Sequence, residues 1–555
     1  MMKRLMTEPQ TLSTRAQTLP TRAQALPTRA QTLPTRAQIL PMRAQILPTR
    51  AQILPTQAQT LPTRAQTLPP GAQASCLQTR GTREVIGNGN AAGKMPALPA
   101  LLALLLVITL LLGSQASVAV GQQSPAPRES ALGMQSAQSL VARQAALVSE
   151  FEVNGLKVLI KRREGSPTVA AGLFIKGGSR NINAENAGIE FLMLDAATEA
   201  SVAFPRDRMR DEQSRMGTVI SSSENNDYSV LALRCTRPNF DRSWQMFADV
   251  ALHPSFTKED VKLVQEKMVV SLRDDTDDPD TYLQRLQEGI AYANHPYLNR
   301  VEGTAESVGR LTPEDLRRYH QKVFETSRLL LVIVGDLDSA KLKTLIAASF
   351  GKLPRGTYAP EQVPQLSFNK STVDVTPRNL PTNYVQGLFT APPPSSPDIY
   401  PMRVASSILR DRIFQEVRAK RNLSYAPDAF LRNQGANIGG IYVTAVDANQ
   451  SVSLMLEEIA RLQKEPIEDE DIQAVVAQYL TTYYMNQETN AAQAAELAAY
   501  ELLGGGWRNS TVFVEKLSAV TPADVERVAQ KYMRNIRFVV LGNPKSIDTR
   551  IFTGG

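Results

Sequence analysis

Three kinds of hydrophobic pattern follow one another along the chain. A seven-residue repeat of the type Thr-Arg-Ala-Gln-x-Leu-Pro fills the first part, and a nearly unbroken apolar run follows at residues 98–112. Beyond it, short apolar runs of strand length alternate with segments in which apolar residues recur at helical spacing. We therefore expect a globular body with mixed helices and strands, preceded by two segments of a different character.

The leader, residues 1–94, carries a proline in each heptad of its repeat. A seven-residue period is typical of a coiled coil, but each proline removes a helix hydrogen bond. We therefore expect a disordered, low-complexity segment. So regular a repeat is also what tandem DNA gives when it is read in frame ahead of a true start at Met95, and both interpretations stay open.

Residues 95–119 combine the apolar run with small residues that end in Ser117-x-Ala119. This pattern is typical of a signal peptide, and it predicts export to the periplasm or cell envelope. No charged residue lies between Lys94 and Arg128, so an uncleaved membrane anchor through 98–112 is the alternative. Residues 120–148 are expected to be a linker.

The body begins with a predicted hairpin. Asn154-Gly155 is a strong two-residue turn signal between strand patterns at 151–153 and 156–161. Further strands are expected at 168–176, 231–235 and 329–334, and helices at 188–199, 240–250 and 258–274. The acidic turn 274–280 lacks the sixth-position glycine and the late glutamate of a calcium loop, so we interpret it as a solvated turn.

The second part of the body repeats the order of the first. Val520-Thr521-Pro522-Ala523-Asp524 repeats the helix start Leu311-Thr312-Pro313-Glu314-Asp315 at an offset of 209 residues. An apolar strand that ends in glycine recurs at an offset of 207, and an acidic helix start recurs at 211. Three matches in the same order predict a duplicated α/β unit, with a proline-rich junction at 353–366.

Charge and composition exclude several classes of function. Of the net charge of +7, twelve basic and two acidic residues before residue 120 supply +10, so residues 120–555 carry −3. A mildly acidic body gives no reason to expect nucleic-acid binding. The only cysteines, Cys76 and Cys235, exclude a Cys-based metal site, and a disulfide framework is not expected.

The helix expected at 188–199 carries a resemblance. It follows a strand that ends in a Gly-Gly-Ser-Arg turn, and Gly188 leads into Phe191-Leu192-Met193-Leu194-Asp195. This order resembles the insulinase/pitrilysin metallopeptidases, in which two histidines of a His-x-x-Glu-His helix hold zinc and the glutamate activates water. The corresponding positions are Phe191, Leu194 and Asp195, and the last zinc ligand of the family falls on Ser271. The resemblance implies the fold with a degenerate zinc site, and no metal in this chain.

The histidines of the chain offer no substitute site. His253, His295 and His320 lie too far apart in sequence for a zinc pair four residues apart on one helix. Two of them precede proline, a context typical of loop structure. We expect structural roles for all three.

A second motif resembles the carboxy-terminal motif of the same family. Arg418 and Tyr425 stand at the family spacing, and the resemblance implies that they bind the substrate carbonyl and main chain near the scissile bond. A guanidinium and a phenol are donors that can stabilise a developing oxyanion. The alternative places Arg418 on a solvated helix face and Tyr425 in the core. Sheet edges that could add a peptide strand are expected near 220–227 and at 437–446, with an ordinary interior strand as the alternative for each.

These observations predict an α+β fold of two duplicated α/β-sandwich domains of the insulinase/pitrilysin type, at 149–352 and 367–548. We expect a non-catalytic subunit that pairs with a zinc-bearing homologous peptidase subunit, as in mitochondrial-processing-peptidase-like heterodimers. It would lend Arg418 and Tyr425 to a chamber for peptide substrates, with the zinc in the partner. A binding or scaffold protein without peptidase activity is the alternative, and an autonomous metallopeptidase is the least favoured one.

Overall fold

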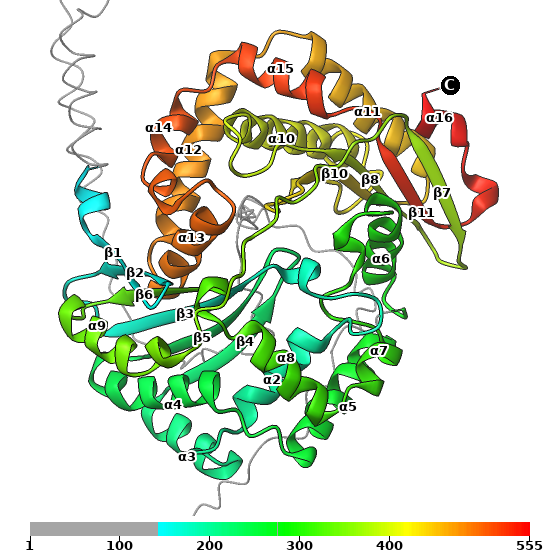
Figure 1. Ribbon diagram of the computed structural model, residues 1–555. Helices are drawn as coiled ribbons and strands as arrows, with labels where there is room; N and C mark the ends of the chain where they lie inside the picture. The colour runs from blue at the N-terminus through cyan, green and yellow to red at the C-terminus, as the bar shows by residue number, and fades with distance from the viewer. Residues whose placement is uncertain (1–141, 275, 555) are drawn as a thin grey trace, which may run out of the picture. The chain divides into compact units, whose positions relative to one another are not determined.

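A computed structural model describes residues 142–274 and 276–554 of the chain. The repeat leader, the signal or anchor segment and most of the linker lie outside these residues. Within the two described ranges, no helix is long and apolar enough to cross a membrane. Figure 1 shows helices packed around two separate sheets. Below, the N-terminal half means residues 148–352, and the C-terminal half means residues 367–553.

The first sheet has six strands in the order β1-β2-β6-β3-β5-β4. Strands β2 and β6 are parallel, and every other neighbouring pair is antiparallel. Its strands are β1 (Val148–Val153), β2 (Leu156–Arg162), β3 (Thr168–Lys176), β4 (Val219–Glu224), β5 (Tyr228–Thr236) and β6 (Leu329–Gly335).

The second sheet repeats this arrangement strand for strand, apart from β1. Its order is β7-β11-β8-β10-β9, with β7 and β11 parallel and the other pairs antiparallel. The strands are β7 (Thr372–Pro377), β8 (Asn383–Thr390), β9 (Asp428–Leu431), β10 (Ile438–Ala445) and β11 (Arg537–Gly542). The predicted duplication and the predicted fold class are therefore confirmed.

Of the two expected sheet edges, the structure confirms one and contradicts the other. Strand β4 lies at the edge of the first sheet, as the segment 220–227 led us to expect. Strand β10 pairs with β8 on one side and β9 on the other, so the edge assigned to 437–446 is wrong. Its apolar and glycine-rich sequence fits a strand buried on both sides.

Local sequence signals fix the ends of several elements. Asn154 and Gly155 both have positive φ, of 50° and 84°, and Val153 lies opposite Leu156. This is the predicted two-residue hairpin, because its turn requires positive φ at both central residues.

The two Thr-Pro helix starts form the same cap. Thr312 before α8 (Pro313–Val323) and Thr521 before α15 (Pro522–Tyr532) each accept a hydrogen bond from the backbone of the aspartate three residues later. That aspartate, Asp315 or Asp524, in turn accepts from the backbone N–H of the threonine. Both helices thus begin with a capping box, which supports the duplication at atomic detail.

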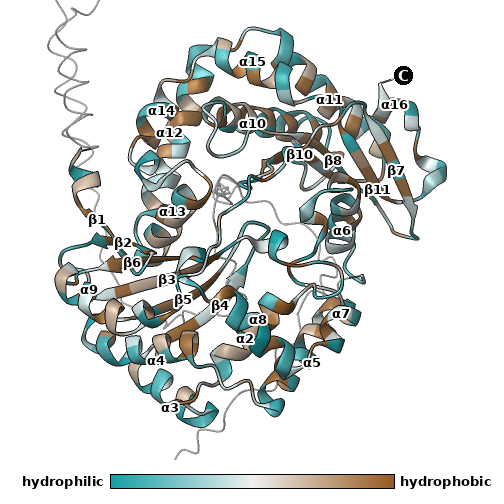
Figure 2. Cartoon of the chain, viewed as in Figure 1, coloured by the Kyte–Doolittle hydropathy of each residue, from teal (hydrophilic) through white to brown (hydrophobic). Residues whose placement is uncertain are grey.

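Helices cover the sheets on the faces where apolar residues alternate. On the first sheet, α2 (Ile189–Glu199) and α4 (Phe240–Leu252) pack on β5, and α5 (Lys258–Asp274) packs on α2. On the second sheet, α10 (Ile399–Ile413) packs on β9, and α11 (Ala448–Lys464) packs on β10. In Figure 2 the strands of both sheets are mostly brown, whereas α3 (Arg206–Met216) is mostly teal. Shorter or peripheral helices are α7 (Ala305–Arg310), α9 (Ser339–Ala348), α12 (Asp469–Asn486), α14 (Phe513–Ser518) and α16 (Thr549–Thr553).

The two halves exchange one helix each. Helix α6 (Pro279–Ala291) belongs to the N-terminal half but packs on β8 and β11, where Leu283 joins Val539 and Leu541. Helix α13 (Asn490–Leu502) belongs to the C-terminal half but packs on β3 and β6. In Figure 1, α6 lies beside β11, and α13 lies beside β3. Each sheet therefore has one face covered by a helix from the other half of the sequence.

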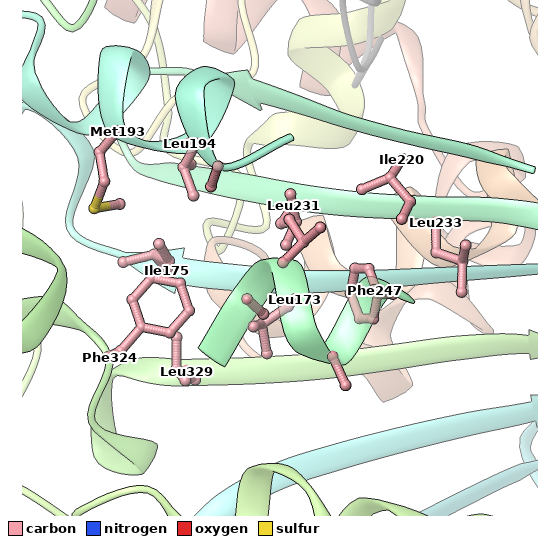
Figure 3. Packing of buried hydrophobic residues seen from close by; sticks show 14 of the residues in the cluster. Leu173, Ile175, Met193, Leu194, Ile220, Leu231, Leu233, Phe247, Phe324 and Leu329 are labelled. Atoms are coloured by element: carbon pink, nitrogen blue, oxygen red, sulfur yellow. The ribbon is translucent and has the colours of Figure 1, made fainter. Parts of the chain in front are cut away.

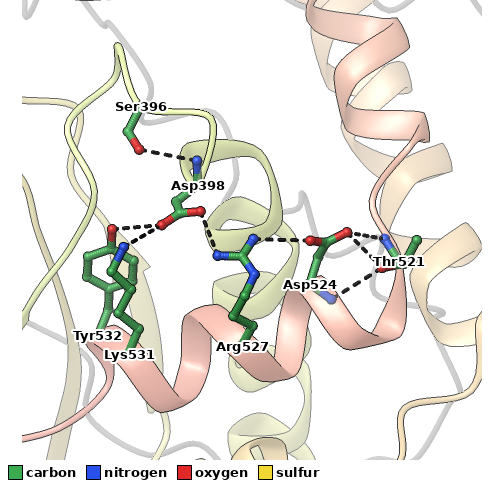
Figure 4. Close-up of polar contacts among 7 residues, drawn as sticks. All are labelled: Ser396, Asp398, Thr521, Asp524, Arg527, Lys531 and Tyr532. Atoms are coloured by element: carbon green, nitrogen blue, oxygen red, sulfur yellow. Dashed lines mark hydrogen bonds and ion pairs between the residues drawn. The ribbon is translucent and has the colours of Figure 1, made fainter.

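A buried aspartate ties the start of α10 to α15. Asp398 accepts hydrogen bonds from Arg527 (2.7 Å), Lys531 (2.9 Å) and the Tyr532 hydroxyl (2.9 Å), as Figure 4 shows. Burial alone would raise the pKa of this carboxyl, but its partners outweigh burial and lower the pKa to about 2. Asp398 is therefore held as a carboxylate.

Candidate functional site

Helix α2 begins at a glycine that no other residue can replace easily. Gly188 has a φ of 88°, and a Cβ at this position would lie 2.6 Å from Cγ2 of Val308 on α7. The glycine therefore permits both the left-handed turn and the close approach of α7. The helix expected at 188–199 is present, one residue shorter at its start.

Two of the degenerate zinc positions lie in the apolar core. Leu194 is 1% exposed, and Figure 3 shows it on the side of α2 that faces Leu231 and Leu173 on the sheet. Phe191 is partly buried and packs against the same core. Neither side chain has a lone pair for a metal, so both act as packing residues at these positions.

The other two positions carry polar side chains. Asp195 accepts a hydrogen bond of 2.5 Å from the Ser222 hydroxyl on β4. Ser271 is half-buried on α5, the helix that packs against α2. The four positions thus offer one carboxylate and no imidazole, whereas a catalytic zinc needs three protein ligands. Zinc does not fit here, and the described residues hold no group of three or more His, Cys, Asp or Glu suited to a metal.

A buried glutamate on α2 was not singled out from the sequence. Glu190 is 5% exposed and accepts hydrogen bonds from Ser229 (2.5 Å), Tyr319 (2.6 Å) and Asn181 (3.2 Å). Burial raises the pKa of its carboxyl, while these donors act in the opposite direction. The network ties α2 to β5 and α8. The sequence offers one indication of this buried carboxyl, which is an acidic residue next to the apolar face of a predicted helix.

Each histidine has a structural partner. His253 Nδ1 lies 2.9 Å from Asp249, His320 Nε2 lies 2.8 Å from the Ala251 carbonyl, and His295 Nε2 lies 2.9 Å from the Pro364 carbonyl. Burial lowers the pKa of His295 and of His320, which favours the neutral ring. These contacts match the structural roles expected from the sequence.

A polar bridge joins the halves beside the edge strand. The Tyr297 hydroxyl donates to Asp227, which also accepts from the backbone N–H of Gly435 (3.0 Å). The backbone N–H of Ala436 donates to the Tyr297 hydroxyl (3.1 Å). Burial raises the pKa of Asp227, so this bridge includes a carboxyl that is less acidic than an exposed one. No local pattern predicts this pairing, because Asp227 and Gly435 are 208 residues apart in the chain.

Arg418 and Tyr425, the two residues of the predicted substrate-binding motif, contact each other. Arg418 lies in a π-helical turn, η7 (Phe414–Ala419), that continues α10. Its Nη1 donates to the Tyr425 carbonyl oxygen (2.7 Å), and its guanidinium lies 4.2 Å from the centroid of the Tyr425 ring. Tyr425 is 79% exposed, so the alternative that places it in the core is wrong. The pair forms a cation–π stack at the surface.

A cavity of about 290 Å³ lies between the first sheet and helices of the C-terminal half. It is bordered by residues of β3, β4 and β5 and by residues of α10, α12, α13 and α14. None of the six residues predicted from the sequence lines this cavity, but Ser222, the partner of Asp195, does. The cavity and Asp195 therefore both adjoin β4, where alternate side chains point to opposite faces of the sheet.

Two family models match the body of the chain. The model described as "Insulinase (Peptidase family M16)" matches residues 157–305, and the one described as "Peptidase M16 inactive domain" matches residues 310–479. Together they span more than half of the chain.

The chain belongs to peptidase family M16. Its sequence contains no His-x-x-Glu-His, and its three histidines are His253, His295 and His320.

Several M16 relatives are subunits of larger assemblies. Cytochrome b-c1 complex subunit 1 of Bos taurus is 25% identical over 277 residues, which are 49% of this chain and 57% of that protein. Mitochondrial-processing peptidase subunit beta of Blastocladiella emersonii is 23% identical and is covered over 87% of its length, with 70% of this chain. An uncharacterized zinc protease of Rickettsia felis is 20% identical over 71% of this chain and 97% of that protein.

Solved structures share the fold. A protease from Helicobacter pylori and a peptidase M16 inactive domain from Pseudomonas fluorescens each give a TM-score of 0.66 at 18% identity. Each similarity covers 71% of this chain, and 99% and 98% of those chains. At this identity the likeness establishes the fold alone.

Proposed function

We propose that this protein is a non-catalytic M16 subunit that pairs with a zinc-bearing homologue and helps to form a chamber for peptides. One observation carries the proposal. Phe191 and Leu194, two of the four positions that the resemblance assigns to the zinc site, are packing residues, whereas Arg418 and Tyr425 are stacked on each other at the surface. A chain that keeps the substrate-binding pair and has no zinc ligands fits a role beside a catalytic partner.

The geometry of the pair suits the binding of a substrate carbonyl. A guanidinium has five N–H donors, and the Tyr425 carbonyl accepts from one nitrogen of Arg418. The ring beneath it fixes the plane of the guanidinium and leaves the Tyr425 hydroxyl near solvent. Donors held in this way can stabilise negative charge on an oxygen of a peptide bound in the partner's active site.

The edge of the first sheet supplies a place for the peptide. Strand β4 has β5 on one side only. An extended peptide can add to such an edge through main-chain hydrogen bonds, which give affinity without demanding one sequence. Ser221, Ser222 and Ser223 on β4 are small and leave room for the side chains of the added strand.

The proposed setting is the periplasm or cell envelope, with zinc held by the partner subunit. The signal or anchor pattern at 95–119 motivates the location. The relatives whose names describe subunits of complexes motivate the partner.

The test is to mix the chain with an M16 homologue from the same cell that carries His-x-x-Glu-His. The mixture should cleave peptides, and Arg418→Ala or Tyr425→Phe should lower kcat by about tenfold or more, as the loss of oxyanion donors does. Arg421→Ala is the matched control, because Arg421 is a nearby arginine that pairs with Glu416. Full activity of the Arg418→Ala mixture would contradict the proposal. So would peptidase activity of the isolated chain with stoichiometric zinc.

A second candidate is a scaffold subunit without a peptidase partner. The similarity to cytochrome b-c1 complex subunit 1 favours it, since that name describes no peptidase. On this hypothesis the chain self-associates, and changes at Arg418 and Tyr425 have no effect on its assembly. Analytical ultracentrifugation of the isolated chain separates the candidates, because self-association without an M16 partner is expected only for the scaffold.

A further inference from the structure

The cavity beside β4 has a floor of small side chains. Ser221 lies opposite Ala232, and Gly172 lies opposite Ala232 on its other side, so these residues share one face of the sheet. Phe174 and Val230 on this face pack against α13. The floor consists of Ala170, Gly172, Ser221, Ser223 and Ala232. Such residues leave space above the sheet where larger ones would fill it.

Aromatic rings from the C-terminal half form the opposite wall. Phe513 lies 5.4 Å from the ring of Tyr483 and 6.2 Å from that of Tyr400, measured between centroids. Tyr479 and Tyr500 also line the cavity. Tilted ring contacts of this kind are favourable, and a further ring placed among them would gain similar contacts.

The cavity is lined by two arginines and one carboxyl group. Arg403 has its guanidinium 5.5 Å from the Phe513 ring centroid and donates to Asn433 (3.3 Å), while its buried Nε has no hydrogen-bond partner among the described residues. Arg234 lines the cavity from the sheet. The single lining carboxyl, Glu496, already accepts from Gln487, and burial raises its pKa. The cavity is thus apolar and cationic, and Arg403 in its lining has one buried N–H group without a partner among the described residues.

We infer that this cavity is a specificity pocket for a bulky apolar side chain, above all an aromatic ring, of an extended peptide added to the edge of β4. The inference rests on the proposed peptide-binding function and names the class of peptide that this chain selects.

The register of the sheet places the side chain. In a strand added to β4, every second residue lies on the same face as Ser221 and Ser223. That face carries the small floor and opens below the aromatic wall. An aromatic side chain entering there contacts Tyr483 and Phe513, and the adjacent peptide carbonyl can accept from Arg403. A lysine or arginine would instead meet Arg403 and Arg234.

Fluorescence anisotropy on the purified chain tests the inference. The probes are labelled Thr- and Ser-rich host peptides with one guest residue: Phe, Leu, Ala or Lys. The Phe guest should bind about tenfold or more tightly than the Ala guest, Leu should fall between them, and Lys should bind no better than Ala. No preference among the guests, or a preference for Lys, would overturn the inference without any mutation.

Two variants locate the binding. Tyr483→Ala removes a wall ring, and Ala232→Phe fills the floor, so each should abolish most of the preference for Phe. Tyr484→Ala is the matched control, since Tyr484 neighbours Tyr483 but is 62% exposed and does not line the cavity. Thermal unfolding checks that all three remain folded. A preference for Phe that survives in folded Tyr483→Ala and Ala232→Phe proteins would place the pocket elsewhere.

The experiment also keeps the two proposals apart. It measures binding to the isolated chain, so it can succeed when no catalytic partner exists. Conversely, the mixed subunits could show activity that depends on Arg418 while the isolated chain shows no preference for an aromatic guest. That result would support the proposed function and contradict the specificity pocket.

Discussion

Leu194, at the position that the family resemblance assigns to the catalytic glutamate, is buried among apolar side chains. A carboxylate in its place would need water or a cation beside it, but its surroundings are Leu173, Leu231 and other apolar side chains. Because burying an unpaired charge costs several kcal/mol, a glutamate at this position would destabilise the fold.

Leu194→Glu should therefore lower the free energy of unfolding by about 4 kcal/mol or more, through the lost apolar contacts and the buried charge. Val270→Glu on α5 is the control, since Val270 is 56% exposed and should change stability by less than about 0.5 kcal/mol. Urea unfolding at neutral pH measures both. Equal stabilities of the two variants would show that the α2 face is not packed as described.

Asp398 makes a second prediction at the residue scale, one that depends on pH. Its folded pKa of about 2 lies below the ordinary value of 3.8, so its contribution is complete above pH ~4 and is lost as the pH falls through about 2. Arg527 and Lys531 are half-exposed, which reduces the contribution to about 1–2 kcal/mol.

Asp398→Asn should accordingly destabilise the protein by about 1–2 kcal/mol at neutral pH, and the difference from wild type should vanish near pH ~2. Guanidinium unfolding at several pH values gives both numbers. Asp471→Asn on the exposed start of α12 should show neither effect. A difference that stays constant with pH would mean that Asp398 acts through its shape rather than its charge.

At the scale of elements, the two equivalent helix caps at Thr312 and Thr521 allow the same substitution to be tested in each half of the protein. Thr312→Ala and Thr521→Ala each remove a capping box of the same composition, so each should cost about 1 kcal/mol. Because the caps lie in different halves, the double variant should lose about the sum. Thr344→Ala, inside the exposed face of α9, should be neutral or slightly stabilising, since alanine favours helix interiors. Chemical denaturation of the four proteins decides the matter, and unequal costs at Thr312 and Thr521 would show that the two caps are not equivalent.

The elements that the sequence predicted well are those whose causes are local. Three elements have the bounds expected from the sequence: the Asn154-Gly155 turn, the strand 168–176 and the helix 258–274. Turn geometry, alternation and helical spacing depend only on residues that are close in sequence. Arg418 and Tyr425 lie close in sequence and contact each other, while the substrate-binding role that the resemblance implies for them stays a prediction.

Features built from distant residues could not be predicted. Whether strand β10 was an edge or an interior strand stayed open, because nothing in its own sequence reveals that β9 pairs with it. The Asp227–Tyr297–Gly435 bridge, the aromatic wall of the cavity and the exchange of α6 and α13 each join residues from far-apart segments. A family resemblance gives the fold, but it does not say which side chains meet across the halves.

At the scale of the whole molecule, the exchanged helices predict that the halves unfold together. Leu283 on α6 is 1% exposed and packs on Val539 and Leu541 of the second sheet. Leu283→Ala should cost about 2–5 kcal/mol and should lower the stability of both sheets, although the residue belongs to the N-terminal half.

In a Trp507→Phe background, Trp244 is the only tryptophan and reports on the core of the first sheet. Its fluorescence should follow the same denaturation curve as far-UV circular dichroism, with and without Leu283→Ala. Two separate transitions, with only one of them shifted by Leu283→Ala, would show that the halves are independent.

The helix exchange also determines whether the two halves separate after a protease cleaves the chain between them. Residues 359–362, between the sheets, are mostly exposed and carry neither helix nor strand, so cleavage is expected there first. Each fragment would still hold the helix that seals the other's sheet, and neither could leave without baring apolar surface to water. The nicked protein should travel through a sizing column as one particle and separate into two bands only in detergent.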